Sequence, residues 1–224
     1  MTSTSSDQHN KTTSQEFESR ALALFHTMNL DEKLGQLNQL SGEEGGISHA
    51  MENAIKEGRV SSVINEVNVD IVNELQRIAV QESRLGIPLL IGRDVIHGFK
   101  TIFPIPLGQA ATWCTDTIEQ GAKIAAMEAA SQGINWTFAP MIDITRDPRW
   151  GRIAESLGED PYLCSVLGNA MIAGFQTQDL SQGDAIASCA KHFAGYGAVE
   201  SGRDYATTNI PENELRNVYL QPFK

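Results

Sequence analysis

The sequence predicts an α/β fold in which parallel strands alternate with helices. Apolar runs of strand length alternate about four times along the chain with segments whose apolar residues recur at helical spacing. Strands that are apolar on both faces are typical of a parallel sheet covered by helices. The predicted strands are 60–67, 87–92, 134–140 and 185–193, and the helices between them are 69–85, 115–132 and 161–177. These patterns leave two architectures open, a doubly wound sheet and a barrel.

The segments before the first strand are predicted to be mostly helical. Residues 1–15 are polar and rich in Ser and Thr, so they predict a disordered tail and lack the basic and apolar regions of a signal peptide. Asn29 or Asp31 is expected to cap one helix, and Gly58 is expected to end another. Helical spacing predicts helices over 17–28, 30–40 and 50–57.

Glycine and proline are expected to mark the boundaries of the later elements. Gly86 and Gly133 follow the last periodic residues of two predicted helices. Pro161 lies in the first turn of another predicted helix, which Asp160 would cap. A final helix is predicted to begin at Pro211.

Composition argues against several classes of partner. The 224 residues suffice for one domain with a sizeable core. With 17 basic and 28 acidic residues, the net charge of −11 argues against binding to nucleic acid or to an anionic membrane. No run approaches the roughly 18 apolar residues of a membrane-spanning helix. No glycine-rich phosphate loop follows a strand, so a nucleotide-binding domain has no support. The cysteines Cys114, Cys164 and Cys189 have no metal-site spacing and predict buried thiols.

A long charged loop runs from Asp143 to Tyr162. It holds three arginines and five carboxylates, together with two prolines and Trp150. Long ordered loops of this kind are often functional. The residues alone are equally compatible with a structural network of ion pairs that holds a crossover connection in place.

Four sequence blocks resemble the N-terminal part of glycoside hydrolase family 3, the broad β-glucosidase family. They occur in the family's order and cover most of the chain from about Leu30 onward. The blocks are GRDVIHG (92–98), FPIPLG (103–108), APMIDITRDPRWGRIAESLGEDPY (139–162) and KHFAGYGAVESGRDY (191–205). This resemblance selects the barrel. It implies that residues 16–224 form the N-terminal half of a (β/α)8 barrel domain.

The resemblance also implies a substrate-binding site made of Asp94, Arg152, Lys191 and His192. Asp94 closes one predicted strand, Arg152 lies in the loop after another, and Lys191 and His192 end a third. Barrel enzymes build their active sites at the carboxyl ends of their strands. The aspartate is expected to accept hydrogen bonds from sugar hydroxyls, and the three basic residues are expected to donate to others. The alternatives are a turn or cap role for Asp94, a structural ion pair for Arg152, and an exposed lysine beside a satisfied histidine.

Other polar residues of these blocks are expected to support the site without touching sugar. Asp143 and Glu155 are expected to be partners of the arginines, and His97 is expected to be structural. Trp150 is more compatible with burial under the loop than with stacking on a sugar, and Asp204 has no role that the sequence assigns. The residues expected to brace the loop are Arg146, Asp147, Arg149, Glu155 and Asp160.

The catalytic carboxylates are expected to lie outside this chain. Retaining glycosidases use two carboxyl groups about 5–5.5 Å apart. In the family, the nucleophile lies in a later block resembling SDW or SDH, and the acid/base of the β-glucosidase branch lies in a second domain. This sequence ends at Lys224, before such a block. We therefore expect no catalytic residue here, a barrel truncated before the nucleophile strand, and a missing C-terminal half as partner.

The expected function is hydrolysis of terminal β-D-glucosyl residues by a retaining exo-β-glucosidase, with a β-glucoside or oligosaccharide as substrate and with neither metal nor organic cofactor. The family branch that acts on N-acetylglucosamine has Gly-His-Gly where this chain has Tyr196 between glycines, which argues against that branch. A β-xylosidase and a non-catalytic carbohydrate-binding or complementing fragment remain open. Lack of a signal peptide predicts the cytoplasm if Met1 is the first residue, although family members are often periplasmic or secreted.

Overall fold

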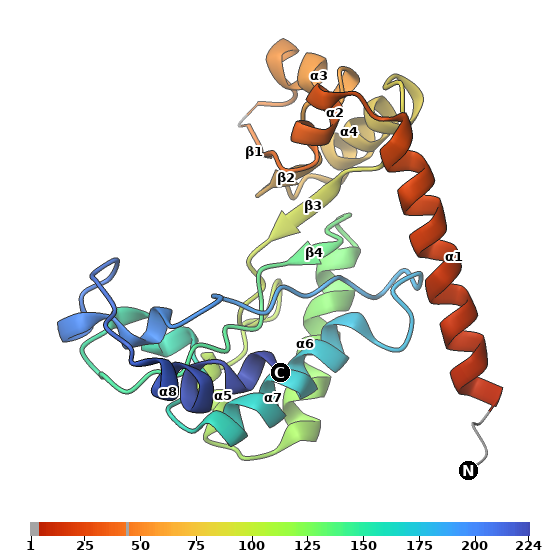
Figure 1. The fold of residues 1–224 in the computed structure, drawn as a ribbon. Helices are drawn as coiled ribbons and strands as arrows, with labels where there is room; N and C mark the ends of the chain where they lie inside the picture. The colour runs from red at the N-terminus through yellow and green to blue at the C-terminus, as the bar shows by residue number, and fades with distance from the viewer. Residues whose placement is uncertain (1–4, 44) are drawn as a thin grey trace. The chain divides into compact units, whose positions relative to one another are not determined.

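The computed structural model describes residues 5–43 and 45–224 and divides them into two compact units (Figure 1). The first unit holds the described residues through Ser62 together with Glu74–Leu89, and the second holds Val63–Asn73 and Leu90–Lys224. Helices alternate with short strands along the chain, so the predicted α/β class is confirmed. No helix in the described ranges is both long and apolar enough to cross a membrane.

The first unit begins with α1 (Ser5–Thr27), which starts earlier than predicted. The sequence predicted a disordered tail over residues 1–15, whereas the structure describes a helix from Ser5; residues 1–4 lie outside the described part. The stretch contains neither glycine nor proline. Because adding residues to an existing helix costs less than nucleating one, the periodic segment after Phe17 can extend toward the N-terminus.

Helix α2 (Leu30–Gly35) starts where predicted and ends earlier than predicted. Asn29 caps it: its side chain accepts from the Glu32 N–H while the Glu32 carboxylate accepts from the Asn29 N–H. The predicted continuation to Leu40 is wrong. A Cβ at Gly35 would lie 2.0 Å from the Gly58 carbonyl oxygen, so the chain passes close to another backbone here and turns into β1 (Gln39–Ser41).

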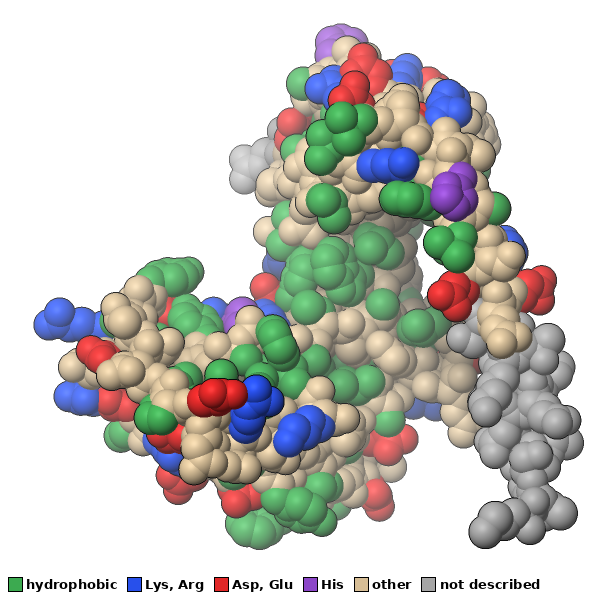
Figure 2. All heavy atoms as spheres, in the orientation of Figure 1, with side chains coloured by type: hydrophobic (Ala, Val, Ile, Leu, Met, Phe, Trp, Pro, Cys, Tyr) green, Lys and Arg blue, Asp and Glu red, His purple; other side chains and the backbone are tan. Residues whose placement is uncertain are grey.

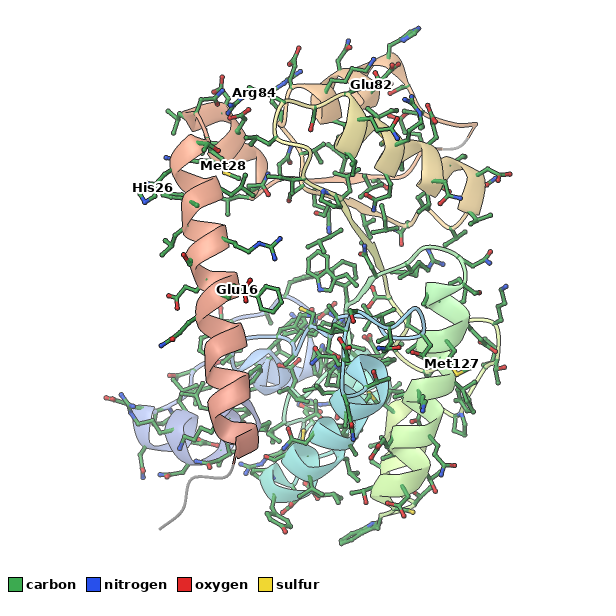
Figure 3. The ribbon with its side chains drawn as sticks, turned by 90° about the vertical axis from the view of Figure 1, so that its right-hand side faces the viewer. Glu16, His26, Met28, Glu82, Arg84 and Met127 are labelled. Atoms are coloured by element: carbon green, nitrogen blue, oxygen red, sulfur yellow. The ribbon has the colours of Figure 1, made fainter. Side chains whose placement is uncertain are left out.

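Ion pairs tie the helices of the first unit together. Arg84, labelled in Figure 3, donates to both oxygens of the buried Glu32 carboxylate and to the Thr27 carbonyl at the end of α1. Glu82 lies within 2.7 Å of both the Lys56 ammonium and the Arg77 guanidinium. Lys56 is the last residue of α3 (His49–Lys56), which ends before Gly58 as predicted.

Helix α4 (Val69–Gln81) is shorter than the predicted 69–85. The Ser83 hydroxyl donates to the Ala79 carbonyl and accepts from the Gly86 N–H. A side chain that bonds the local backbone in this way offers an alternative to the helical ladder. Gly86 therefore lies in the turn after the helix and is not its direct stop.

Strand β2 (Ser62–Ile64) begins at the last residue of the first unit's opening segment. The second unit holds β3 (Leu90–Arg93) and β4 (Trp136–Thr137), which follow β2 in the order of the sheet. Strands β3 and β4 pair in parallel, with Gly92 opposite Trp136. The Asn135 side chain and backbone both bond to Ile91, which fixes this register. Helix α6 (Thr115–Ala130) connects the two strands, as a parallel arrangement requires.

The predicted strand 185–193 is only partly correct. Isolated parallel bridges join Trp136 to Ala187 and Met141 to Lys191, but no continuous strand forms in this fully described segment. Pro140 has no N–H to donate, so the ladder is interrupted beside it. The peptide bonds Ala139–Pro140, Lys191–His192 and Phe193–Ala194 are cis. The bridges nevertheless carry Lys191 alongside Ile142, whose N–H donates to the Lys191 carbonyl at 2.8 Å.

Helix α6 packs against α7 (Pro161–Gln176), which Asp160 caps through the Leu163 N–H as predicted. Short helical turns form between β3 and β4, between β4 and α7, and after α7. The sequence did not predict most of them; α8 corresponds to the helix predicted from Pro211. They are α5 (Pro106–Ala110), η1 (Gly151–Glu155), η2 (Tyr196–Ala198), η3 (Glu200–Gly202), α8 (Glu212–Glu214), the π-helix η4 (Leu215–Tyr219) and η5 (Gln221–Phe223). Of the three thiols predicted to be buried, only Cys164 is fully so.

Acidic and basic side chains are interspersed on the face that Figure 2 shows. The described residues also form exposed ion pairs such as Arg77–Glu74 and Arg216–Glu212. Exposed ion pairs contribute little to stability, typically below about 1 kcal/mol each. The fold therefore depends mainly on its apolar core.

Candidate functional site

Three connections of the second unit place the four predicted site residues. Asp94 follows β3 directly, and Arg152 lies in η1, within the loop after β4. Lys191 and His192 end the bridged segment that runs beside residues 136–141. All four therefore lie beyond the carboxyl ends of parallel segments, where α/β barrel enzymes build their sites.

Asp94 and Lys191 form an ion pair, with the Lys191 Nζ 2.8 Å from the Asp94 Oδ1. The lysine side chain is only 12% exposed, whereas the aspartate side chain is 55% exposed. The ammonium group is thus held mostly inside the protein while the carboxylate faces solvent. The pair leaves the second carboxylate oxygen available for a hydroxyl donor.

His192 is held by the buried carboxylate of Asp143. The Asp143 Oδ2 accepts from the His192 backbone N–H at 2.9 Å and from the ring Nδ1 at 2.7 Å. A carboxylate only accepts hydrogen bonds, so Nδ1 carries the proton and Nε2 is the acceptor nitrogen of the neutral ring. The predicted pairing of Asp143 with an arginine is wrong, because the parallel bridge at Met141 brings His192 beside Asp143.

Arg152 is bound by Glu155 in a two-bond pair, with both nitrogen–oxygen distances 2.7 Å. This confirms the predicted arginine partner and holds the pKa of the Glu155 carboxyl below its usual range. The Arg152 Nη1 lies 3.5 Å from the His192 Nε2. Because Lys191 and His192 are consecutive, these contacts join all four predicted site residues into one group.

Three aromatic and polar side chains lie against this group. The Tyr196 ring packs edge-to-face against the rings of His192 and Trp150, and in each pair the ring centroids are 4.9 Å apart. Asp204 accepts from the Trp150 Nε1–H at 3.0 Å and from the Tyr196 hydroxyl. Trp150 is fully buried, which confirms the prediction that it lies under the loop.

The charged loop is closed at its base and braced along its length. The Thr145 N–H donates to the Gly158 carbonyl, and the Thr145 and Ser156 hydroxyls are 2.7 Å apart in a buried contact. Asp147 pairs with Arg149 through two nitrogens, and this contact lowers the pKa of Asp147 to about 2. These contacts agree with the predicted bracing role. His97 bonds the Phe103 carbonyl through Nδ1 and is structural, as expected.

Sequence reasoning missed the role of Tyr196 and left Asp204 without one. The only signal was their position inside the block KHFAGYGAVESGRDY, which is long for a simple connection. Tyr196 and Asp204 are eight positions apart, and no predicted helix or strand contains them both. Their contact depends on the turns η2 and η3 between them.

Charged side chains gathered beyond the carboxyl ends of parallel strands are typical of α/β enzymes. The model of the glycosyl hydrolase family 3 N-terminal domain matches residues 29–224. The chain therefore belongs to glycoside hydrolase family 3.

Relatives of known name support this assignment. The chain is 40% identical to the periplasmic β-glucosidase of Salmonella typhimurium over 201 residues, which cover 90% of this chain and 26% of the relative. It is 34% identical to a β-xylosidase of Formosa agariphila over 74% of this chain and 25% of the relative. Solved structures of the Listeria innocua β-glucosidase with isofagomine and with glucose superpose with TM-scores of 0.80 and 0.79. Both are 38% identical to this chain and cover 92% of it and 30% of the Listeria chain.

The sequence thus spans about a quarter to a third of the relatives that it matches. The range matched by the family model, residues 29–224, contains the four predicted site residues.

Proposed function

We propose that this chain supplies the wall that binds the terminal sugar in a retaining exo-β-glucosidase. The observation that carries the proposal is the linked group of Asp94, Lys191, His192 and Arg152 beyond the strand ends. It offers a solvent-facing carboxylate, an ammonium, an imidazole acceptor and a guanidinium within one network. Vicinal hydroxyls both donate and accept, so a pyranose is a suitable ligand for such a mixed set.

Asp94 is proposed to bind sugar and not to react with it. Its carboxylate is paired with an ammonium at 2.8 Å, which orients it as a hydrogen-bond acceptor. Retention requires a nucleophile and an acid/base about 5–5.5 Å apart. We propose that both carboxyl groups come from protein outside residues 1–224. The purified chain is then expected to release no nitrophenol from a nitrophenyl β-glucoside.

Glucose is preferred over xylose because the relative with 40% identity is a β-glucosidase, and because the Listeria enzyme was solved with glucose. A β-xylosidase is the second candidate, favoured by the likeness to the Formosa enzyme. The two differ in the hydroxymethyl group of the sugar. Comparing isofagomine with a xylose-like iminosugar separates them.

The test is thermal melting of the chain with and without isofagomine. A ligand at a hundred times its Kd is expected to add about 2.7 kcal/mol to the free energy of unfolding. Asp94→Ala should abolish this shift. Asp116→Ala, an exposed carboxylate on α6, serves as the matched control and should retain it. An equal shift in the wild type and in Asp94→Ala would refute the site, and nitrophenyl glucoside turnover by the wild-type chain would refute the binding-only role.

A further inference from the structure

Tyr196 contacts both of the basic residues that face each other in the site. Its ring meets the His192 ring at 4.9 Å with an interplanar angle of 83°, and the Arg152 guanidinium carbon lies 5.4 Å from its centroid. These are the geometries of an edge-to-face aromatic pair and of a cation–π contact. The phenol ring is therefore a surface shared by Arg152 and His192.

The same tyrosine is anchored on its other side. Its hydroxyl donates to Asp204, and the same carboxylate oxygen accepts from the Trp150 indole N–H. These two bonds hold the pKa of Asp204 below its usual range. Trp150 is fully buried with Met141 and Val199, so the anchor is part of the core. Asp204 thus connects the tyrosine to a side chain that cannot move without unpacking the unit.

The backbone around Asp204 is also fitted to this contact. Gly202 has a φ of +65°, and a Cβ there would lie 2.8 Å from the Trp150 nitrogen and from the Arg149 Cβ. The turn η3 therefore lies directly against the charged loop. Only glycine adopts this conformation at such a close approach without strain.

We propose that Tyr196, fixed through Asp204 to the buried Trp150, is a positioning residue for Arg152 and His192. The proposal rests on the proposed sugar-binding function and adds a residue to it. Glu155 and Asp143 each hold one of the two basic side chains from behind. Tyr196 supplies the surface that keeps them facing each other, with Nη1 and Nε2 3.5 Å apart. Without the Tyr196 ring, Arg152 would be held only by Glu155, and the His192 ring only by Asp143, on the side away from the other basic residue.

The experiment uses the 224-residue chain labelled with nitrogen-15. Hydrogen exchange of the Arg152 Nε–H reports whether the guanidinium is held; its resonance is assigned by its loss in Arg152→Lys. The affinity for isofagomine is measured by calorimetry, and the melting midpoint reports stability. The variants are Tyr196→Leu, which removes the ring, and Tyr196→Phe and Asp204→Ala, which remove the anchor. Tyr162→Leu, an exposed tyrosine on α7, is the matched control.

Tyr196→Leu is expected to speed the exchange and weaken isofagomine binding, each roughly threefold to tenfold, as loss of a cation–π and ring contact implies. The two anchor variants should fall between Tyr196→Leu and the wild type, and Tyr162→Leu should change neither quantity. If the Leu variant does not fold, Tyr196→Phe retains the packing and decides the question.

Unchanged exchange in folded Tyr196 and Asp204 variants would overturn the positioning role, whatever their stability. A lowered melting midpoint alone would mean that the cluster only supports the core, and this too would overturn it. If the exchange order holds while the wild type binds no isofagomine, the positioning of Arg152 stands and the sugar-binding function is wrong.

Discussion

At the scale of single residues, the buried carboxylate of Asp143 decides what His192 can do. It accepts from both the backbone and the ring of His192, and its own side chain is fully inaccessible. The ring nitrogen that faces Arg152 is therefore an acceptor in the neutral form. The sequence predicted that His192 donates a hydrogen bond to a sugar hydroxyl. In the neutral ring the donor nitrogen is Nδ1, which already donates to Asp143.

We predict that Asp143→Ala lowers the free energy of unfolding by about 1–3 kcal/mol, because two donors of His192 lose their partner inside the protein. Urea denaturation measures the change. Glu119→Ala removes an exposed carboxylate from α6 and should stay within about 0.5 kcal/mol of the wild type. Equal effects of the two substitutions would show that the Asp143 contact contributes nothing specific.

At the scale of elements, the contact between α6 and α7 depends on small residues. The buried face of α6 carries Ala122, Ala125, Ala126 and Ala129, and α7 presents Gly174 to it. A Cβ at Gly174 would lie 2.2 Å from the Glu119 carbonyl oxygen and 2.7 Å from the Ala122 Cβ. Gly121, on α6 itself, would place its Cβ in open space.

This contrast gives a matched pair of substitutions. Gly174→Ala is expected to destabilise the chain by about 1–3 kcal/mol because α7 must move away from α6. Gly121→Ala is expected to stabilise it by about 0.5–1 kcal/mol, since alanine loses less conformational freedom in a helix. Thermal melting of both variants checks the two signs. A stabilising Gly174→Ala would mean that the helices are not in close contact there.

The elements also show where local pattern is sufficient. Helices α6 and α7 were predicted within two residues at each end because their apolar periods are long and their boundaries carry Asp160, Pro161 and Gly133. The strand over 185–193 was overextended. Its apolar run is compatible with pairing, but Pro140 on the neighbouring segment lacks a donor, and this is a property of the partner.

At the scale of the whole molecule, acid is expected to weaken the chain through its paired carboxylates. Contacts with arginine or with hydrogen-bond donors lower the pKa of Asp147, Glu155 and Asp204. A carboxyl group whose pKa is lower when folded stabilises the fold above its unfolded pKa. That contribution disappears as the pH falls through the folded pKa.

For Asp147 this window lies between the ordinary value of 3.8 and about 2, where Arg149 holds it. We predict that the melting midpoint of the wild type exceeds that of Asp147→Asn above about pH 4 and that the difference shrinks toward pH 2. Melting curves across this range provide the measurement. A difference that grows on acidification would contradict the sign of the effect.

The sequence by itself determined the α/β class and the family, because these depend on apolar period and on blocks of residues read along the chain. It also predicted four site residues, which remain a prediction. The tertiary structure decided how those residues are held. Asp143 contacts His192, which lies 49 positions further along the chain. Asp204 contacts Tyr196 and Trp150, which lie 8 and 54 positions before it. No helix or strand contains both members of any of these pairs, so a local period could not reveal them. Parallel bridging beside Pro140 and the turns η2 and η3 create the contacts, and only the folded backbone specifies them.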